Sequence, residues 1–208
     1  GDFGALTEQG EYYVEVAGVG RSASFRIAPD VYAAPFETAM LGFYAWRSGI
    51  DVSLTHDGTT FSHAAGHLDD AALDFVPGMS GTRDGTGGWY DAGDYGKYVV
   101  NAGITVGMML RAWEDFSDVL SHIGLPIPEA GGALPDYLDE IKWELDWLLK
   151  MQIYDDGRVS HKLTPYSFTG FVMPAEDTER RYFSPWGSAA TADLAAVMAQ
   201  ASRVFEPY

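Results

Sequence analysis

The chain has 208 residues, enough for one domain or for a small domain joined to part of another. It carries 13 basic and 30 acidic residues, a formal net charge of −17, so neither nucleic acid nor an anionic membrane is expected as a partner. The absence of cysteine excludes a disulfide framework and a thiolate metal site, and no apolar run reaches the length of a membrane span.

Residues 12–27 are predicted to form two strands joined by a tight turn. Apolar and polar side chains alternate loosely on either side of Gly18-Val19-Gly20, whose glycines suit the turn. Two strands alone are only marginally stable in water, so this pair is not expected to form a domain by itself.

A helix is predicted after a linker marked by Pro29 and Asp30. Pro35 suits the first turn of a helix, apolar residues recur at helical spacing from Phe36 onward, and Gly49 lies beyond the end. The aromatic residues of this segment are expected in the core rather than on a binding surface.

Residues 50–86 are predicted to form a long irregular loop rich in glycine, aspartate, serine and histidine. A loop of this length is uncommon in a compact domain unless it is functional or disordered. It contains side chains from which a metal site could be built: His56, His63, His67, Asp69, Asp70 and Asp74.

The next stretch, Gly87-Gly88-Trp89-Tyr90-Asp91-Ala92-Gly93-Asp94-Tyr95-Gly96-Lys97-Tyr98, places two carboxylates three residues apart among glycines and aromatic residues. Glycine allows sharp bends and the close approach of a ligand, and aromatic rings offer flat apolar faces to a partner such as a sugar ring. A periodic apolar segment begins where the run ends, which places both aspartates on a loop that leads into a helix. Such a pair can activate a water, bind a cation, or simply cap a helix and turn the chain.

Three further helices are predicted in the rest of the chain. The first covers about residues 101–116 and carries Gly103 and Gly107 at a spacing that permits close packing. The second is amphipathic and has Pro135 in its first turn. The third is alanine-rich and covers residues 188–204.

A second long irregular stretch, residues 153–185, is crowded with aromatic residues. Its Asp155-Asp156-Gly157 lacks the acidic spacing of an EF-hand and is interpreted as a turn. The crowding of aromatic residues with two arginines, Arg180 and Arg181, indicates a ligand-facing surface, to which His161 and Trp186 are assigned.

The run from Gly87 to Gly103 resembles glycoside hydrolase family 9, the inverting endoglucanases with an (α/α)6 barrel. The family hallmark Asp-Ala-Gly-Asp stands at residues 91–94 in the setting Gly-Gly-Trp-(His/Tyr)-Asp-Ala-Gly-Asp-Tyr, and Lys-Tyr-Val-Val-Asn-Ala-Gly follows at residues 97–103. The resemblance continues through Ser188-Ala189-Ala190-Thr191-Ala192-Asp193 to the C-terminus. Within the family, the chain most resembles a bacterial subgroup that has an immunoglobulin-like domain before the barrel.

The resemblance implies a mainly α fold in two incomplete domains. Residues 30–208 would form the N-terminal part of the (α/α)6 barrel, and residues 1–29 the last hairpin of an immunoglobulin-like β-sandwich. The chain is therefore expected to be an interior segment of a longer protein. The family also implies a secreted or extracytoplasmic location, although no signal peptide is visible in this chain.

Inverting hydrolysis needs two carboxyl groups roughly 6.5–9.5 Å apart, one that deprotonates a water and one that protonates the leaving oxygen. The resemblance implies that Asp94 is the general base and that Asp91 helps to hold and polarise the water. The general acid is a glutamate outside this chain, so the segment alone is expected to be inactive. Residues predicted to bind substrate are Trp89, Tyr90, Tyr95, His161 and Trp186, while Tyr90, Tyr95 or Lys97 could orient the aspartates.

The resembling subgroup holds a structural zinc with two cysteines and two histidines, and the matching positions here are Ser48, Gly66, His67 and His161. Zinc needs about four good ligands. Because both cysteines are replaced, zinc is not expected, and His67 and His161 are the remaining candidate ligands. No cofactor is expected to be required, and a structural calcium would be bound by regions outside this chain.

The leading functional hypothesis is an endo-β-1,4-glucanase that acts on cellulose or a related β-glucan, together with the remainder of the same polypeptide. Tyr90, where many glucanases have histidine, and the acidic net charge leave open an exo-β-glucosaminidase acting on chitosan oligosaccharides, which are cationic. A non-catalytic carbohydrate-binding module is the third hypothesis, but it would leave the Asp-Ala-Gly-Asp loop without explanation.

Overall fold

A computed structural model describes residues 2–208 and divides the chain into two units, one ending at Ala39 and the other covering residues 40–208. Helix α1 (Ala33–Ala45) begins in the first unit and ends in the second. None of the helices formed by the described residues is long and apolar enough to cross a membrane.

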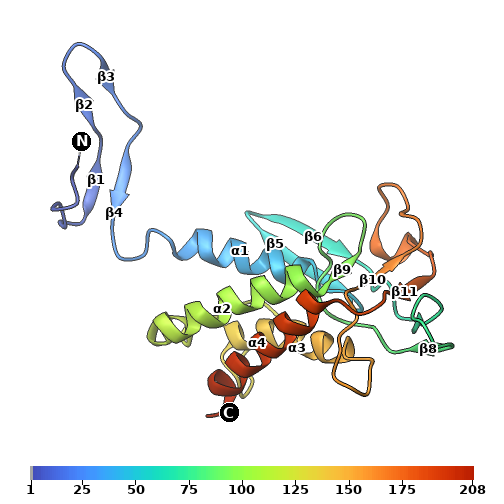
Figure 1. Cartoon of the computed structure of the whole chain (residues 1–208). Coiled ribbons are helices and arrows are strands. Elements are labelled where there is room, and N and C mark those ends of the chain that lie inside the picture. The colour runs from blue at the N-terminus through green and yellow to red at the C-terminus, as the bar shows by residue number, and fades with distance from the viewer. Residues whose placement is uncertain (1) are drawn as a thin grey trace. The chain divides into compact units, whose positions relative to one another are not determined.

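The first unit is a long antiparallel hairpin, drawn in dark blue in Figure 1. Strand β1 (Gly10–Tyr12) pairs with β4 (Phe25–Ile27), and β2 (Glu15–Val16) pairs with β3 (Gly20–Arg21). Gly18 between β2 and β3 has φ +77°, a conformation that glycine adopts at no steric cost. The predicted strand pair and its turn are confirmed.

The second unit is built on three helices: α2 (Val99–Leu120), α3 (Asp136–Lys150) and α4 (Ser188–Phe205). Helix α2 packs against both α3 and α4 (Figure 1). All three predicted helices are confirmed to within a few residues, because their apolar periodicity is strong. Phe116, the predicted end of the first of them, is the point where α2 leaves helical geometry, with φ −137° and ψ 26°.

The core of the second unit lies between these helices. Val99, Val106 and Leu110 of α2 are fully buried, as are Leu138 and Ile141 of α3. The rings of Trp113 and Tyr137 stack across the α2–α3 contact with their centroids 6.1 Å apart. Burial of apolar surface on this scale is the main stabilising contribution to such a fold.

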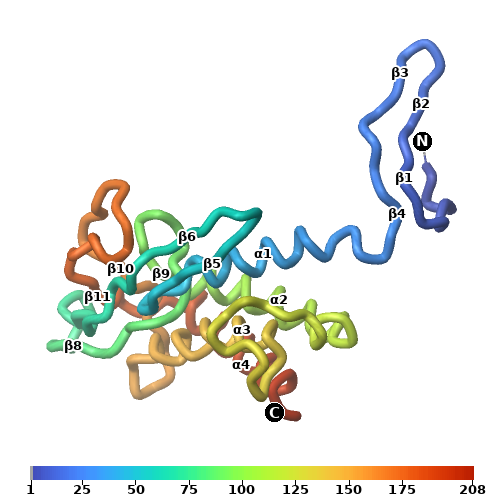
Figure 2. Tube along the Cα trace, turned by 180° about the vertical axis from the view of Figure 1, so that it is seen from behind, coloured from blue at the N-terminus to red at the C-terminus, as the bar shows by residue number. Residues whose placement is uncertain are grey.

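A five-stranded sheet of very short strands lies at one end of the helices (Figures 1 and 2). Its order is β8–β7–β11–β10–β9, and the strands are β7 (Ala71–Ala72), β8 (Thr82–Arg83), β9 (Lys97–Tyr98), β10 (Lys162–Pro165) and β11 (Arg181–Phe183). Strand β9 immediately precedes α2, and β11 is followed closely by α4. The sheet therefore joins the end of the aspartate loop to two segments far away in sequence.

The prediction that residues 50–86 and 153–185 are irregular was wrong in part. They contain β7, β8, β10, β11, a 3-10 turn (Pro174–Glu176) and a separate hairpin of β5 (Val52–His56) and β6 (Thr59–His63). The hairpin had a readable signal, because buried Val52 and Leu54 alternate with exposed residues and Asp57-Gly58 makes the turn. The strands of the five-stranded sheet had no readable signal, since two to four residues are too few to show an alternation of buried and exposed side chains.

Candidate active site

The aspartate loop begins with a stretch of backbone held against the end of α1. Gly88 accepts a hydrogen bond from the backbone of Ser48 at 2.8 Å, and Tyr90 N donates to Trp46 O at 2.9 Å. Gly87 and Gly88 have φ +84° and +74°, which is why glycine is found at both positions. These bonds fix the direction in which the chain enters the aspartate pair.

The aspartates themselves lie on a tight turn closed by its own backbone. Asp91 N donates to Gly96 O at 2.9 Å, and Tyr95 N donates to Ala92 O at 2.9 Å. Tyr95 occupies the left-handed region with φ +56°, which is uncommon for a residue with a side chain. The turn thus presents Asp91 and Asp94 from one short, internally bonded loop.

Each of the two carboxylates has one oxygen held by a donor. Asp91 Oδ1 accepts from Asn101 Nδ2 at 2.7 Å, and Asp94 Oδ1 accepts from Gly96 N at 2.8 Å. No other hydrogen bond reaches either carboxylate from residues 2–208. Asp91 is exposed and Asp94 is half-buried, so a second oxygen of each remains available to a water molecule or a ligand.

A pocket of about 190 Å³ opens beside this turn. Asp91 lines it, whereas Asp94 does not. The other lining residues are mainly aromatic or polar: Phe43, Trp46, Trp89, Tyr90, Tyr98, Asn101, Ala102, Thr105 and Glu144. Carbohydrate sites commonly combine flat apolar faces with a few polar groups in this way.

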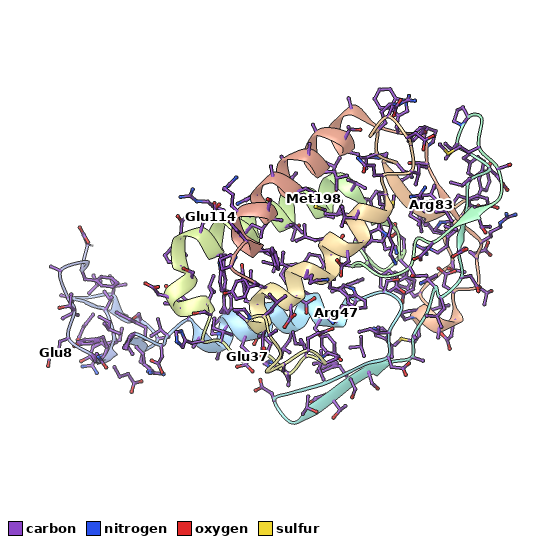
Figure 3. All side chains as sticks on the ribbon, turned by 90° about the horizontal axis from the view of Figure 1, so that it is seen from below. Glu8, Glu37, Arg47, Arg83, Glu114 and Met198 are labelled. Carbon is purple, nitrogen blue, oxygen red and sulfur yellow. The ribbon has the colours of Figure 1, made fainter. Side chains whose placement is uncertain are left out.

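Two glutamates of α3 accept hydrogen bonds from Trp89. Glu140 Oε1 accepts from Trp89 Nε1 at 2.8 Å and from Arg47 Nε at 3.1 Å, and Glu144 Oε2 accepts from Trp89 N at 2.5 Å. Arg47, labelled in Figure 3, also bonds Glu129 at 3.0 Å. Arg47 and Glu140 are both completely buried. Burial raises the pKa of Glu140 despite the attraction of Arg47.

Lys97 anchors the glycine stretch from inside the molecule. Its Nζ donates to the carbonyls of Gly85 and Gly87, each at 2.6 Å, and the side chain is 1% exposed. Burial, with a smaller contribution from the charge of Arg181, lowers the pKa of Lys97. Burial also raises the pKa of its fully buried neighbour Glu144. The lysine therefore fixes the loop by hydrogen bonds rather than by an exposed charge.

A second buried chain of polar groups supports Tyr90. Its hydroxyl lies 2.6 Å from His67 Nδ1, and His67 Nε2 lies 3.2 Å from Asp177 Oδ2. Burial, and then the charge of Arg181, lower the pKa of His67 from 6.5 to about 4, and burial raises the pKa of Tyr90 to about 12. At neutral pH, His67 is therefore uncharged, and it accepts from Tyr90 and donates to Asp177.

The structure brings the predicted site residues into two groups. Asp91, Asp94, Trp89, Tyr90 and Tyr95 share one loop, and the three aromatic residues are only 8%, 4% and 9% exposed. In the second group, His161 and Trp186 are exposed on adjoining segments: His161 N donates to Pro185 O at 3.2 Å, and Val99 N donates to His161 O at 3.1 Å. Sugar binding by these residues stays a prediction.

The four positions matched to a zinc site do not form a suitable ligand set. Both ring nitrogens of His67 are already hydrogen-bonded. Gly66 offers no ligand, and a Cβ placed there would lie 2.4 Å from the carbonyl oxygen of Pro174. Within residues 2–208 there is no group of three or more histidine, aspartate or glutamate side chains that could hold a metal ion.

Several contacts that shape the site were not predicted from the sequence. Arg47 bonds Glu129 across 82 positions of the chain, and Arg181, expected only as part of a ligand-facing surface, contacts Tyr95 of the loop from 86 positions away. No local pattern reveals either contact. Glu140 and Glu144 had a signal, because their spacing of four places them on one face of α3, together with the buried Trp147. Asn101 was noted only as part of the family-like run.

Known proteins share both the sequence and the structure of this chain. The sequence model of the family described as glycosyl hydrolase family 9 matches residues 32–208. Endoglucanase D of Acetivibrio thermocellus is 52% identical over 208 residues, an alignment that covers all of this chain and 33% of the relative. The xyloglucan-specific endo-beta-1,4-glucanase BoGH9A of Bacteroides ovatus is 38% identical over 213 residues, covering all of this chain and 36% of the relative.

Solved structures agree with these sequence matches. The structure described as Bacteroides ovatus GH9 matches all of this chain with a TM-score of 0.87 at 37% identity, and the chain covers 38% of it. Family 9 endoglucanase J30 matches with a TM-score of 0.87 at 36% identity and is covered to 40%. The chain spans about a third of the length of the curated relatives that it matches. On these matches, the chain belongs to glycosyl hydrolase family 9.

Proposed function

We propose that the protein containing this chain hydrolyses β-1,4-glycosidic bonds in cellulose or a related β-glucan with inversion of configuration. The observation that carries this proposal is the aspartate pair, in which each carboxylate has one oxygen fixed by a donor and the other available. The names of two relatives, an endoglucanase and a xyloglucan-specific endo-beta-1,4-glucanase, support this substrate class.

In the proposed mechanism, Asp94 is the general base. The Gly96 N–H holds one oxygen of its carboxylate, and the other oxygen takes a proton from the attacking water. Asp91, oriented by Asn101, holds and polarises that water. The general acid would be a glutamate supplied by the rest of the polypeptide, at a distance that leaves room for the water. This reaction needs no redox cofactor.

The wider organisation belongs to the same proposal. Residues 30–208 would form the first part of an (α/α)6 barrel, and the hairpin before it would be the end of an immunoglobulin-like domain. We also infer a secreted or extracytoplasmic location from the polysaccharide substrate. On this basis, residues 1–208 expressed alone would be inactive, because the general acid and part of the cleft are missing.

The test is the release of reducing ends from carboxymethyl cellulose by the full-length protein, with Asp94→Asn as the key variant. We expect the variant to lose about 10²–10⁴-fold in rate, the usual contribution of a general base. Asp118→Asn makes the same chemical change at an exposed position of α2 and should retain wild-type activity. The anomeric configuration of the first product, followed by NMR, tests inversion.

Chitosan oligomers, assayed in parallel, test the alternative substrate. The net charge of −17 favours a cationic substrate, and Tyr90, which lines the pocket beside the aspartate turn, leaves this alternative open. Turnover of chitosan oligomers alone would replace the glucanase with a glucosaminidase. Sugar binding without turnover in wild type and variant alike would favour a non-catalytic module.

A further inference from the structure

We propose that Arg181 is a positioning residue for Asp94 and acts through the peptide group that joins Tyr95 to Gly96. The inference rests on the proposed function, since it takes Asp94 as the base. Arg181 lies on β11, 86 positions after Tyr95, and it reaches the aspartate loop because the sheet brings these segments together.

Both polar ends of this one peptide group are engaged. Arg181 Nη2 donates to the carbonyl oxygen of Tyr95, and the N–H of Gly96 donates to Asp94 Oδ1 at 2.8 Å. A cation on the carbonyl polarises the whole amide group and makes its N–H a stronger donor, because hydrogen bonds in series reinforce one another in a low dielectric. Arg181 therefore orients the donor that holds Asp94 and strengthens it.

The backbone conformation of Tyr95 requires support from neighbouring residues. Tyr95 has φ +56°, a conformation that costs free energy for a residue with a side chain and persists only when the surroundings over-determine it. The Tyr95 hydroxyl donates to Val172 O, and its ring contacts Tyr90 at 4.9 Å and His67 at 5.7 Å between centroids. These contacts fix the side chain, but among residues 2–208 only Arg181 donates a hydrogen bond to the carbonyl. Without Arg181, the peptide group could rotate and release Asp94.

The burial of Arg181 argues against a purely stabilising role. The residue is 7% exposed. Within the part of the chain that the structure describes, its closest carboxylate is Asp177 at 4.0 Å, and its Nε and Nη1 atoms have no hydrogen-bond partner. A buried arginine without a bidentate carboxylate is expensive in desolvation compared with an apolar side chain of the same size. Selection for stability alone would not favour such a residue at this position.

Few charged or titratable groups face Asp94. Asp91 lies in the same loop, Tyr98 faces it from β9 and Arg181 from β11. Of these, Arg181 is the cation. Arg181 therefore also places a positive charge facing the proposed base. The other groups around Arg181 are Asp177, Tyr90, Tyr98, His67 and Lys97.

The test compares four variants in the full-length protein on a soluble β-glucan: Arg181→Met, Arg181→Lys, Arg180→Met and Asp94→Asn. We expect Arg181→Met to lower kcat by up to about 10²-fold with little change in KM, the effect of misplacing a catalytic group. Arg181→Lys keeps the positive charge but not the planar guanidinium group, so its kcat should also fall with little change in KM.

Arg180→Met is the matched control, because it removes one positive charge from an exposed neighbour that pairs with Asp74 at 3.4 Å. It should keep the wild-type kcat and KM. If both Arg181 variants fold and show wild-type kcat while Asp94→Asn is inactive, the inference is overturned and the proposed function stands. If wild type and Asp94→Asn are equally inactive on every glucan, the proposed function fails instead.

Thermal unfolding of each variant separates positioning from stability. A lower Tm for Arg181→Met with unchanged kcat below that Tm would make Arg181 a structural residue and overturn the inference. If Arg181→Met does not fold, Arg181→Lys decides: a reduced kcat supports the inference, and a wild-type kcat overturns it.

Discussion

Asn101 reaches back from the first turn of α2 to Asp91, with 2.7 Å between Nδ2 and Oδ1. The helix thereby fixes one aspartate of the pair while the turn fixes the other. We expect Asn101→Ala to lower kcat about 10-fold, because Asp91 would lose its orientation. Since Asn101 is exposed, unfolding free energy should change by less than about 0.5 kcal/mol. Steady-state kinetics and urea unfolding measure the two effects.

Gln200→Ala on α4 is the control for Asn101, because it removes a similar amide that bonds only Glu114 at 3.4 Å. It should leave kcat unchanged. Equal kcat values for Asn101→Ala and wild type would mean that Asp91 needs no support from α2.

Arg47 and Glu140 form a buried pair beneath Trp89. In Arg47→Met, the carboxylate of Glu140 would keep its bond from Trp89 but lose the buried guanidinium that it pairs with at 3.1 Å. Breaking a buried pair by removing one partner costs about 3–5 kcal/mol, because it leaves an uncompensated charge. We expect a loss of this size in the free energy of unfolding measured in urea.

The double variant Arg47→Met, Glu140→Gln should recover most of that loss. Glutamine keeps an acceptor for Trp89 Nε1 but carries no charge to bury. A single variant that loses less than about 1 kcal/mol, or a double variant no better than the single, would show that this pair does not carry the stability of the loop.

The sequence predicts the helices and the aspartate turn, but not what holds the turn. Residues such as Leu138 and Ile141 repeat along one face over four turns, so the period is readable without a structure. Asp91 and Asp94 are found because their chemistry and their support by neighbouring glycines are local. Arg181, by contrast, contacts Tyr95 only because the sheet aligns distant strands, and nothing near Arg181 records that register.

The strands of the five-stranded sheet were not predicted for the same reason: their pairing is not visible in the local sequence. Ala71-Ala72 and Thr82-Arg83 have no alternation of their own, and they are strands because they pair with each other and because β11 pairs with Ala72. Tertiary pairing decides such segments, whereas propensity decides little over two residues.

Gly88 packs directly on the ring of Trp147. A Cβ there would lie 2.6 Å from Trp147 Cγ, whereas a Cβ at Gly87 would meet nothing within 4 Å, although both residues have positive φ. Gly87→Ala should therefore cost only backbone strain, about 1 kcal/mol, and Gly88→Ala about 1–3 kcal/mol more through overpacking. The difference in unfolding free energy between the two variants, measured in urea, gives the cost of the clash with Trp147. Equal losses of unfolding free energy would show that there is no such clash.

His67 makes the stability of the folded chain depend on pH. Its pKa falls from 6.5 in the unfolded chain to about 4 when folded, because it is buried and faces Arg181 and, more weakly, Lys97. Between these values the unfolded state binds more protons, so stability present above pH 6.5 is lost as the pH falls, by up to about 3 kcal/mol. Asp177 opposes this shift, and Tyr90, with a pKa of about 12, does not titrate in this range.

The variant His67→Asn tests this linkage. Asparagine tolerates the left-handed backbone that His67 occupies, with φ +57°, and it cannot titrate. The free energy of unfolding, measured in urea between pH 7 and pH 4, should therefore fall less steeply for the variant, by up to about 1.4 kcal/mol per pH unit. His122→Asn changes an exposed histidine beyond α2 and should follow the wild-type curve. Parallel curves for His67→Asn and wild type would mean that His67 titrates alike in both states, and that the acid lability of the fold lies elsewhere.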